Sequence, residues 1–415
     1  MKKHITKTIA LLLAAAMLFL GASCTGSPAA PSSGSKTENL SAAFTAARAR
    51  GRQADDAFAK AQAGFAVELF KNGIRDGNNS LVSPLSVLLA LAMAANGADG
   101  ETLAEMEKML GLPIDELNEY AAAFANDLPN DEKCKVIPAN SIWIRGKCPV
   151  KEDFLSKNAE YYGADAFRAP FDDGTVNDVN NWIREKTDGM IPKTIEKIEH
   201  DTMMMLINAL IFEAEWSEPY PDYAVESGVF HSPTGDEKAQ LMGSKEQAYI
   251  SDGMAEGFIK SYAGGRYSFA ALLPNEGVSL SDYAASLTGE GLLETLSGAK
   301  DETVFARLPK FSYDYEIRLN DALENMGMVS AFYEGAADFS RMSELELYVG
   351  KVIHKTHIEV CEKGTRAGAV TVITFDSAGI ETNVHEITLD RPFVYMIVDN
   401  ATNLPIFIGT LNHVN

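Results

Sequence analysis

Apolar and polar residues alternate with helical spacing through most of the first half of the chain. Over Asp55–Arg75, apolar residues recur at the three- and four-residue steps of an amphipathic helix. The residues expected in its core are Phe58, Phe65, Val67, Leu69 and Phe70. Similar patterns predict helices over Glu101–Leu110, Ile114–Asn126, Lys151–Tyr162, Asn177–Thr187 and Asn320–Met326.

A more apolar helix is expected after Ser83-Pro84. Serine is a favoured N-cap, proline fits the first helical position, and Asn96-Gly97 provides a stop. Because the residues between are apolar nearly all round, this helix should be buried. Another apolar run, Thr202–Trp216, fits either a buried helix or a central strand, and its periodicity does not distinguish the two.

Strand patterns dominate from Gly228 onward. One hairpin is expected around Gly264-Gly265, and another near the C-terminus with its turn at Asn400–Asn403. The stretches Glu302–Leu319 and Leu347–Gly364 each fit a strand. Helices first and strands afterwards favour an α+β fold in which the two kinds of element are segregated.

A targeting segment is expected at the N-terminus. Three lysines precede the short apolar run Ile9–Leu20, as in the signal peptide of an exported protein, which we place at residues 1–23. The small residues before Cys24 resemble the lipobox of bacterial lipoproteins, in which the cysteine is lipidated after cleavage. We therefore expect a lipid anchor at a bacterial surface, with secretion after simple cleavage as the alternative.

The residues after Cys24 have the composition of a linker. Thr25–Asn39 is rich in Ser, Gly, Pro and Ala, which is typical of a flexible segment. No second linker follows. We therefore expect a tether over residues 24–54 and one folded domain over residues 55–415.

The overall charge is strongly acidic. The chain has 415 residues, 46% of them hydrophobic, and a formal net charge of −22. This charge repels nucleic acid and anionic lipid and would attract a basic partner, although it also serves solubility alone. We expect a monomer with no nucleic-acid partner.

The cysteines indicate neither a disulfide nor a metal site. Cys134 and Cys148 flank one expected strand, which would hold them roughly 45 Å apart, beyond disulfide reach. Cys361 has no obvious partner. No Cys or His spacing fits zinc, so no metal and no cofactor are expected.

No catalytic motif is evident. The sequence lacks a G-x-S-x-G elbow, a P-loop and an H-E-x-x-H pair. His354 and His357 are three residues apart in an expected strand, so they face opposite sides and cannot form a metal pair. A Ser-His hydrolase is an alternative, because triad members need not be close in sequence, but we expect no enzyme.

Several motifs occur in the order found in serpins. NSLVSPLSVLLALAMAANGADGET resembles the early buried helix of that family, NNWIREKTDGMI its Asn-Trp-Val stretch, and LINALIFEAEW its central strand. LPKFSYDYEIRLNDALENMGMVSAF and LYVGKVIHKTHIEVCEKGTRAGAVT follow, and RPFVYMIVDNATNLPIFIGTL resembles the serpin C-terminus. The resemblance covers about Asp55–Leu411 and implies that Thr202–Trp216 is a strand.

This resemblance implies a fold of three β-sheets, eight or nine helices and an exposed reactive-centre loop. Most serpins are suicide inhibitors of proteases. A serine protease cleaves the loop and becomes an acyl-enzyme, and the cleaved loop then inserts into the main sheet and carries the protease to the far pole. A surface-tethered binding protein that uses this fold without inhibition is the alternative.

The composition of the loop fits a segment that is solvated before cleavage and buried afterwards. If Thr365 is the first side chain to face inward, alternate residues through Phe375 follow it, and Arg366 faces solvent. Burying an unpaired charge would cost several kcal/mol, so this phase favours an inhibitor. The residues that match the serpin hinge are Gly364, Thr365, Arg366, Ala367, Gly368, Ala369, Val370 and Thr371.

Other serpin positions are matched one at a time. Trp216 and Glu362 match the breach, where the loop first enters the sheet. Beneath the sheet, a polar group called the shutter is matched by Ser83, Ser86, Asn208 and His354.

The predicted bait is a small residue. Counting from Gly364 as in the family places the scissile bond at Ala378–Gly379, with Phe375 and Ile380 as rivals because the loop is a few residues long. Residues 367–390 contain no Lys or Arg, which a trypsin-like protease requires. We therefore expect an elastase-like target.

Overall fold

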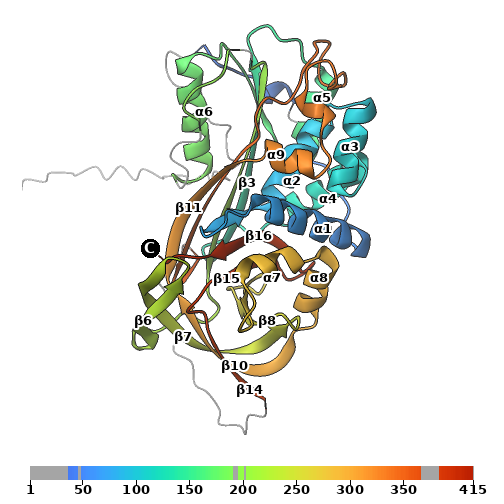
Figure 1. The fold of residues 1–415 in the computed structure, drawn as a ribbon. Coiled ribbons are helices and arrows are strands. Elements are labelled where there is room, and N and C mark those ends of the chain that lie inside the picture. The colour runs from blue at the N-terminus through green and yellow to red at the C-terminus, as the bar shows by residue number, and fades with distance from the viewer. Residues whose placement is uncertain (1–35, 45–47, 190–194, 201, 366–382, 415) are drawn as a thin grey trace, which may run out of the picture.

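The computed structural model describes residues 36–44, 48–189, 195–200, 202–365 and 383–414 (Figure 1). The helices of this part are α1 (Asp56–Gly73), α2 (Pro84–Ala95), α3 (Gly100–Leu110), α4 (Ile114–Asn126), α5 (Glu152–Tyr162), α6 (Asp173–Lys186), α7 (Leu280–Ser286), α8 (Gly289–Ser297) and α9 (Asn320–Asn325). Short 3₁₀ helices lie at Ser41–Phe44, Asp222–Ala224 and Ser330–Phe332.

The strands form two hydrogen-bonded sheets. The first has seven strands in the order β1-β4-β3-β5-β13-β12-β11, and the second has nine, in the order β14-β10-β7-β8-β9-β15-β16-β2 with β6 paired to β7. The strands are β1 (Glu38–Asn39), β2 (Ser80–Val82), β3 (Cys134–Arg145), β4 (Asp165–Ala169), β5 (Met204–Glu215), β6 (Val225–Ser232), β7 (Gly235–Ser251), β8 (Ala255–Ser261), β9 (Tyr267–Pro274), β10 (Lys300–Pro309), β11 (Phe311–Arg318), β12 (Ile353–Cys361), β13 (Gly364–Thr365), β14 (Val384–Thr388), β15 (Phe393–Asp399) and β16 (Leu404–Leu411).

The three expected sheets are therefore seen as two continuous networks, because β7 belongs to two groups of strands. Most of its length pairs with β6 and β10, and only Ala248–Ser251 pairs with β8. Hydrogen bonding consequently runs without a break from the edge strand β14 to β2.

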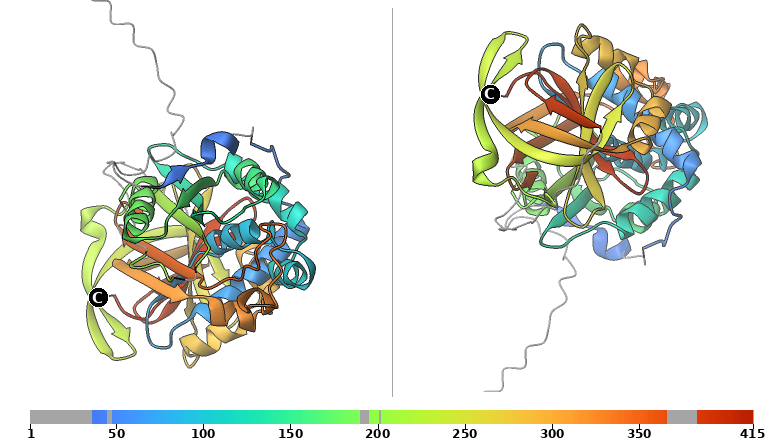
Figure 2. Two further views of the ribbon diagram at one scale, coloured as in Figure 1. Left: turned by 90° about the horizontal axis from the view of Figure 1, so that it is seen from above. Right: turned by 90° about the horizontal axis from the view of Figure 1, so that it is seen from below.

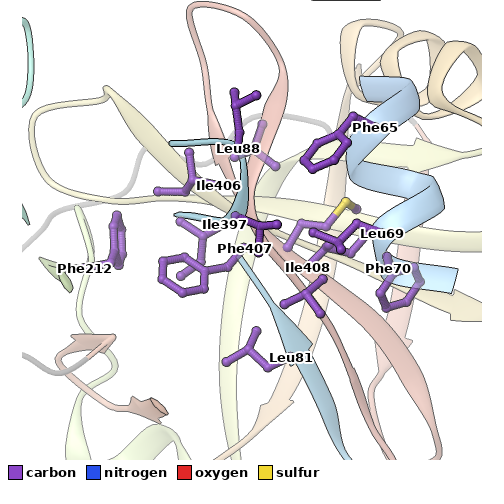
Figure 3. Close-up of a cluster of buried hydrophobic side chains, with 14 of the residues drawn as sticks. Phe65, Leu69, Phe70, Leu81, Leu88, Phe212, Ile397, Ile406, Phe407 and Ile408 are labelled. Carbon is purple, nitrogen blue, oxygen red and sulfur yellow. The ribbon is translucent and has the colours of Figure 1, made fainter. Parts of the chain in front are cut away.

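The helices cover the sheets from different sides. Helix α6 lies on one face of the seven-stranded sheet, where Trp182 packs edge-on against Phe167 and Phe167 stacks on Trp143. On the other face, α2 contacts both β5 and β16. Figure 3 shows the core there, with Phe212 from β5 beside Ile397 and Phe407 from the second sheet. In both views of Figure 2 the N-terminal helices gather on one side of the strands.

Most of the expected elements are present. Helix α2 has Ser83 as its N-cap and Pro84 in its first turn, as predicted. The ambiguous run Thr202–Trp216 is the central strand β5. Both expected hairpins form, as β8–β9 and β15–β16.

Four expectations differ from the structure. Glu302–Leu319 forms two strands, β10 and β11, which belong to different sheets. Strand β12 begins only at Ile353, so the first part of Leu347–Gly364 is not strand. Helices α7 and α8 were not predicted; they are short and depend on the N-caps Ser279 and Thr288. Phe58 is only partly buried, although it packs against the core.

The folded body begins before residue 55, where its boundary was expected. Glu38 and Asn39 pair with Arg168 and Phe167, which adds β1 to the edge of the seven-stranded sheet. Thr37 is buried, and its hydroxyl donates to Asp178 of α6 at 2.7 Å. Part of the expected tether is therefore docked on the body.

Cys134, Cys148 and Cys361 are free thiols, which confirms that they form no disulfide. Within the described residues, no helix is both long and apolar enough to cross a membrane.

Candidate functional site: the hinge seat and the slot below it

The first two hinge residues are already part of the seven-stranded sheet. Gly364 and Thr365 form β13, which pairs antiparallel with β5 on one side and β12 on the other. The Thr365 side chain is 3% exposed, and its hydroxyl lies 2.5 Å from that of Tyr262. Thr365 thus faces inward as predicted, but the hinge is not wholly solvated before cleavage.

Gly364 is needed because the neighbouring backbone is very close. A Cβ at this position would lie 2.1 Å from the Ala214 carbonyl oxygen and 2.8 Å from the Glu215 Cα. No side chain fits at those distances. Any larger residue would therefore push β13 out of its place between the two strands.

Aromatic rings form the floor of this seat. Trp216 is buried and stacks on Tyr262, with ring centroids 4.5 Å apart and an interplanar angle of 9°. The Trp216 indole donates to the Cys361 carbonyl at 2.9 Å, and its backbone N–H donates to Lys363 at 2.8 Å. Trp216 therefore ties the end of β5 to the turn that leads into the hinge.

An ion pair closes the same end of the slot. Lys310 Nζ lies 2.7 Å from Glu362 Oε1, and the Glu362 carbonyl accepts from Tyr220 N at 2.9 Å. Burial opposes ionisation of Glu362, but the hydrogen bond from Lys310 outweighs it, so the pKa of this carboxyl lies below its usual range. Glu362 is therefore charged at neutral pH and anchors the turn before β13.

Beyond Thr365 a narrow slot separates β5 from β12. A cavity of about 30 Å³ lies between the two strands, with Thr365 at its end. Its walls come from Phe212 and Ile358, and Ile397 and Phe407 of the second sheet lie behind it. In the described residues, each of these strands pairs with β13 and with its outer neighbour, but not with the other. A cavity of this size holds about one water molecule, so a strand can enter only if β5 and β12 separate.

A polar cluster links the two strands to α2 farther along the slot. Ser83 N donates to His354 Nε2 on β12 at 2.9 Å, and Ser83 Oγ donates to the Ile406 carbonyl at 2.8 Å. Ser86 Oγ donates to Asn208 on β5. The four shutter residues predicted from the sequence are thus brought together, with α2 connecting the strands that border the slot.

Comparison with known proteins follows from this geometry. A family model described as "Serpin (serine protease inhibitor)" matches residues 60–414. The chain belongs to the serpin family. Serpins are mostly protease inhibitors rather than enzymes.

The relatives include solved and curated serpins. The crystal structure of tengpin, a thermophilic serpin, in its native state matches with a TM-score of 0.86 at 46% identity, covering 91% of this chain and 99% of tengpin. A serpin-like protein of Thermococcus kodakarensis is 29% identical over 358 residues, 84% of this chain and 83% of that protein. Leukocyte elastase inhibitor A of Mus musculus is 29% identical over 369 residues, 83% of this chain and 96% of that protein. The expected serpin fold is confirmed.

The remaining predicted sites lie outside the described residues. These are the hinge from Arg366 to Thr371, the bond at Ala378–Gly379 and the lipid-attachment residue Cys24. Among the residues that are described, no group of three or more His, Cys, Asp or Glu side chains is arranged to hold a metal ion.

Sequence reasoning missed three residues of the site. Tyr262 receives the first hinge side chain, Lys310 pairs with Glu362, and Asn140 accepts from Asn208 Nδ2 at 2.5 Å. Each lies far from its partner along the chain, and no local pattern identifies such pairs. Only the three-dimensional arrangement of the sheets reveals them.

The buried His354 should make the stability of this serpin depend on pH. Burial lowers its pKa to about 4, while an unfolded histidine titrates near 6.5. The unfolded chain therefore binds a proton that the native state does not, and native stability falls as pH drops from about 6.5 towards 4, by on the order of 3 kcal/mol.

Thermal unfolding at pH 7.5 and pH 4.5 checks this prediction. A His354→Gln variant should be less stable than wild type at pH 7.5 but should lose less stability on acidification, because glutamine does not titrate. An equal acid-induced decrease in the melting temperature of both proteins would show that His354 does not contribute.

Proposed function

We propose that this serpin traps serine proteases by inserting its cleaved loop between β5 and β12. The observation that carries the proposal is the position of Thr365, seated between these strands with its side chain buried. Continuing the strand from Thr365 puts small or apolar side chains inward and Arg366 outward. Insertion therefore buries no charge, which removes the largest cost of the step.

Insertion competes with hydrolysis in this mechanism. The protease serine attacks the carbonyl carbon of Ala378, the peptide bond to Gly379 breaks, and the amine of Gly379 leaves with a proton. This produces an ester that water would normally cleave. If the loop inserts first, the protease is moved away while still attached. The bonds from α2 to Asn208 and His354 must rearrange as β5 and β12 separate, so the shutter would set part of the barrier.

We propose an elastase-like protease as the target. The predicted bait, Ala378, suits a small pocket, and residues 367–390 contain no basic residue. A relative that is 29% identical is named leukocyte elastase inhibitor A, which supports the same class.

Incubation with an elastase should yield a covalent complex that survives boiling in detergent. Mass spectrometry should detect a released C-terminal peptide that begins at Gly379. A peptide beginning elsewhere would move the bond, and a binding protein without inhibitory activity would give no complex. A hydrolase would instead turn over small esters, which this serpin should not do.

We also propose that Cys24 carries lipid and holds the protein at a bacterial surface. The proposal rests on the small residues before Cys24 and the apolar run that precedes them. Metabolic labelling with a fatty-acid analogue should mark the wild-type protein and not a Cys24→Ala variant. Equal labelling of both proteins, or of neither, would reject the anchor.

A further inference from the structure

Exposed apolar side chains concentrate near the end of the slot that lies farthest from the hinge. Ten large hydrophobic residues are exposed in the described part, and five of them fall within Val329–Ile353. Leu345, Tyr348 and Ile353 are 40%, 41% and 43% exposed. Single exposed apolar residues are ordinary, but several on one short segment indicate a contact surface.

Backbone pairing gathers this segment at one end of the seven-stranded sheet. Ile353 begins β12 and pairs with Arg318 at the end of β11. Val349 N donates to the Ala331 carbonyl at 2.8 Å, which joins the segment to the turn after α9. The hinge lies at the opposite end of β12, beside Val360 and Cys361. In Figure 1, α9 lies well above β14, the strand at the loop end of the molecule.

The register of β13 indicates where an inserted loop would end. Gly364 pairs with Glu215 and Cys361, and Thr365 pairs with Ala214 and Val360, both antiparallel. Each further loop residue would therefore lie one position back along β5 and β12.

Continuing this register sets the level of the cleaved bond. Val372 would lie level with Ile353 and Phe375 level with Met204, where β12 and β5 begin. Ala378 would lie three residues beyond Met204, level with Leu347. The acylated residue would thus lie beside the segment that carries Leu345 and Tyr348.

We infer that Leu345, Tyr348 and Ile353 form a landing surface for the protease esterified to Ala378. The inference rests on the proposed function, since it concerns the trapped complex. A protease attached at Ala378 must lie against whatever surrounds that position, and this segment presents apolar side chains there. Burying them beneath the protease favours the trapped arrangement over one in which the protease moves freely and regains its geometry.

Hydrogen exchange tests the contact directly. The elastase complex is compared with the same serpin cleaved in its loop by a metalloprotease, which forms no acyl-enzyme. Backbone amides of residues 345–353 should exchange more slowly in the complex than in the cleaved, protease-free serpin. Equal exchange in the two forms would overturn the landing surface.

Substitution tests its consequence. A variant with Leu345→Ser, Tyr348→Ser and Ile353→Thr should form complex at the wild-type rate, but the complex should release active protease about tenfold faster. A matched control replaces three exposed apolar residues at the loop end, with Val229→Thr, Phe305→Thr and Val384→Thr. Its complex should last as long as that of wild type.

The outcomes separate the two proposals. If wild type forms no covalent complex, the proposed function fails and the landing surface fails with it. If wild type traps the protease and the triple variant's complex lasts as long as wild type's, only the landing surface is overturned. A control variant whose complex decays as fast as the triple variant's would also overturn it, because the effect would then not depend on this end of the molecule.

Discussion

Replacing Thr365 with arginine should convert this inhibitor into a substrate. Thr365 is buried between β5 and β12, with its hydroxyl 2.5 Å from Tyr262 and a cavity of only about 30 Å³ beside it. An arginine would have to place a cation beneath the sheet, at a cost of several kcal/mol. Slowing insertion by about 3 kcal/mol lowers its rate roughly a hundredfold, so deacylation should win.

The neighbouring residue provides the matched control. Arg366 follows Thr365 directly and would face solvent in the inserted strand, so Arg366→Glu should leave trapping nearly unchanged. The measurement is the yield of stable complex against the yield of cleaved serpin for both variants. If Thr365→Arg traps protease as well as wild type, or if Arg366→Glu is the more damaging change, the phase of the inserted strand is wrong.

Changing the bait should redirect the inhibitor to a different protease. Residues 367–390 contain no Lys or Arg, so wild type should form no complex with trypsin, whose specificity pocket contains a carboxylate. Ala378→Arg supplies the missing cation, and the rate of trypsin trapping should rise by at least about a hundredfold. Its rate with elastase should fall, because the small pocket excludes a long side chain.

The rivals for the scissile bond provide the control for this change. Phe375→Arg or Ile380→Arg should give cleavage by trypsin at the new residue, but less complex than Ala378→Arg, because the acyl group would lie at the wrong distance from the hinge. If either rival variant traps trypsin more efficiently than Ala378→Arg, the bond is not at Ala378–Gly379.

Local sequence signals were enough to place many elements and part of the site. Ser83 and Pro84 predict the start of α2 because an N-cap and a first-turn proline act within a few residues. The inward direction of Thr365 could also be predicted, since side-chain alternation along a strand is a local property. The shutter was found through family resemblance, because its four residues are spread from Ser83 to His354.

Features that depend on distant contacts were missed. The seating of Gly364 and Thr365 before cleavage depends on how far β5 and β12 are held apart, which no local pattern encodes. The docking of Glu38 on β4 was hidden by the linker-like composition around it. Lys310 lies between two strands that local alternation reads as one, so its pairing with Glu362 could not be anticipated.

Hydrogen exchange in β5 and β12, measured before and after cleavage of the loop by a metalloprotease, tests the central claim most directly. It requires no knowledge of the natural target. Before cleavage, the facing edges of β5 and β12 are unpaired with each other below Thr365 in the described residues. If the cleaved loop inserts, amides of Met204–Phe212 and Ile353–Glu359 should exchange markedly more slowly, because a new strand would pair with both. Unchanged exchange in both strands after complete cleavage of the loop would contradict insertion and, with it, the proposed mechanism.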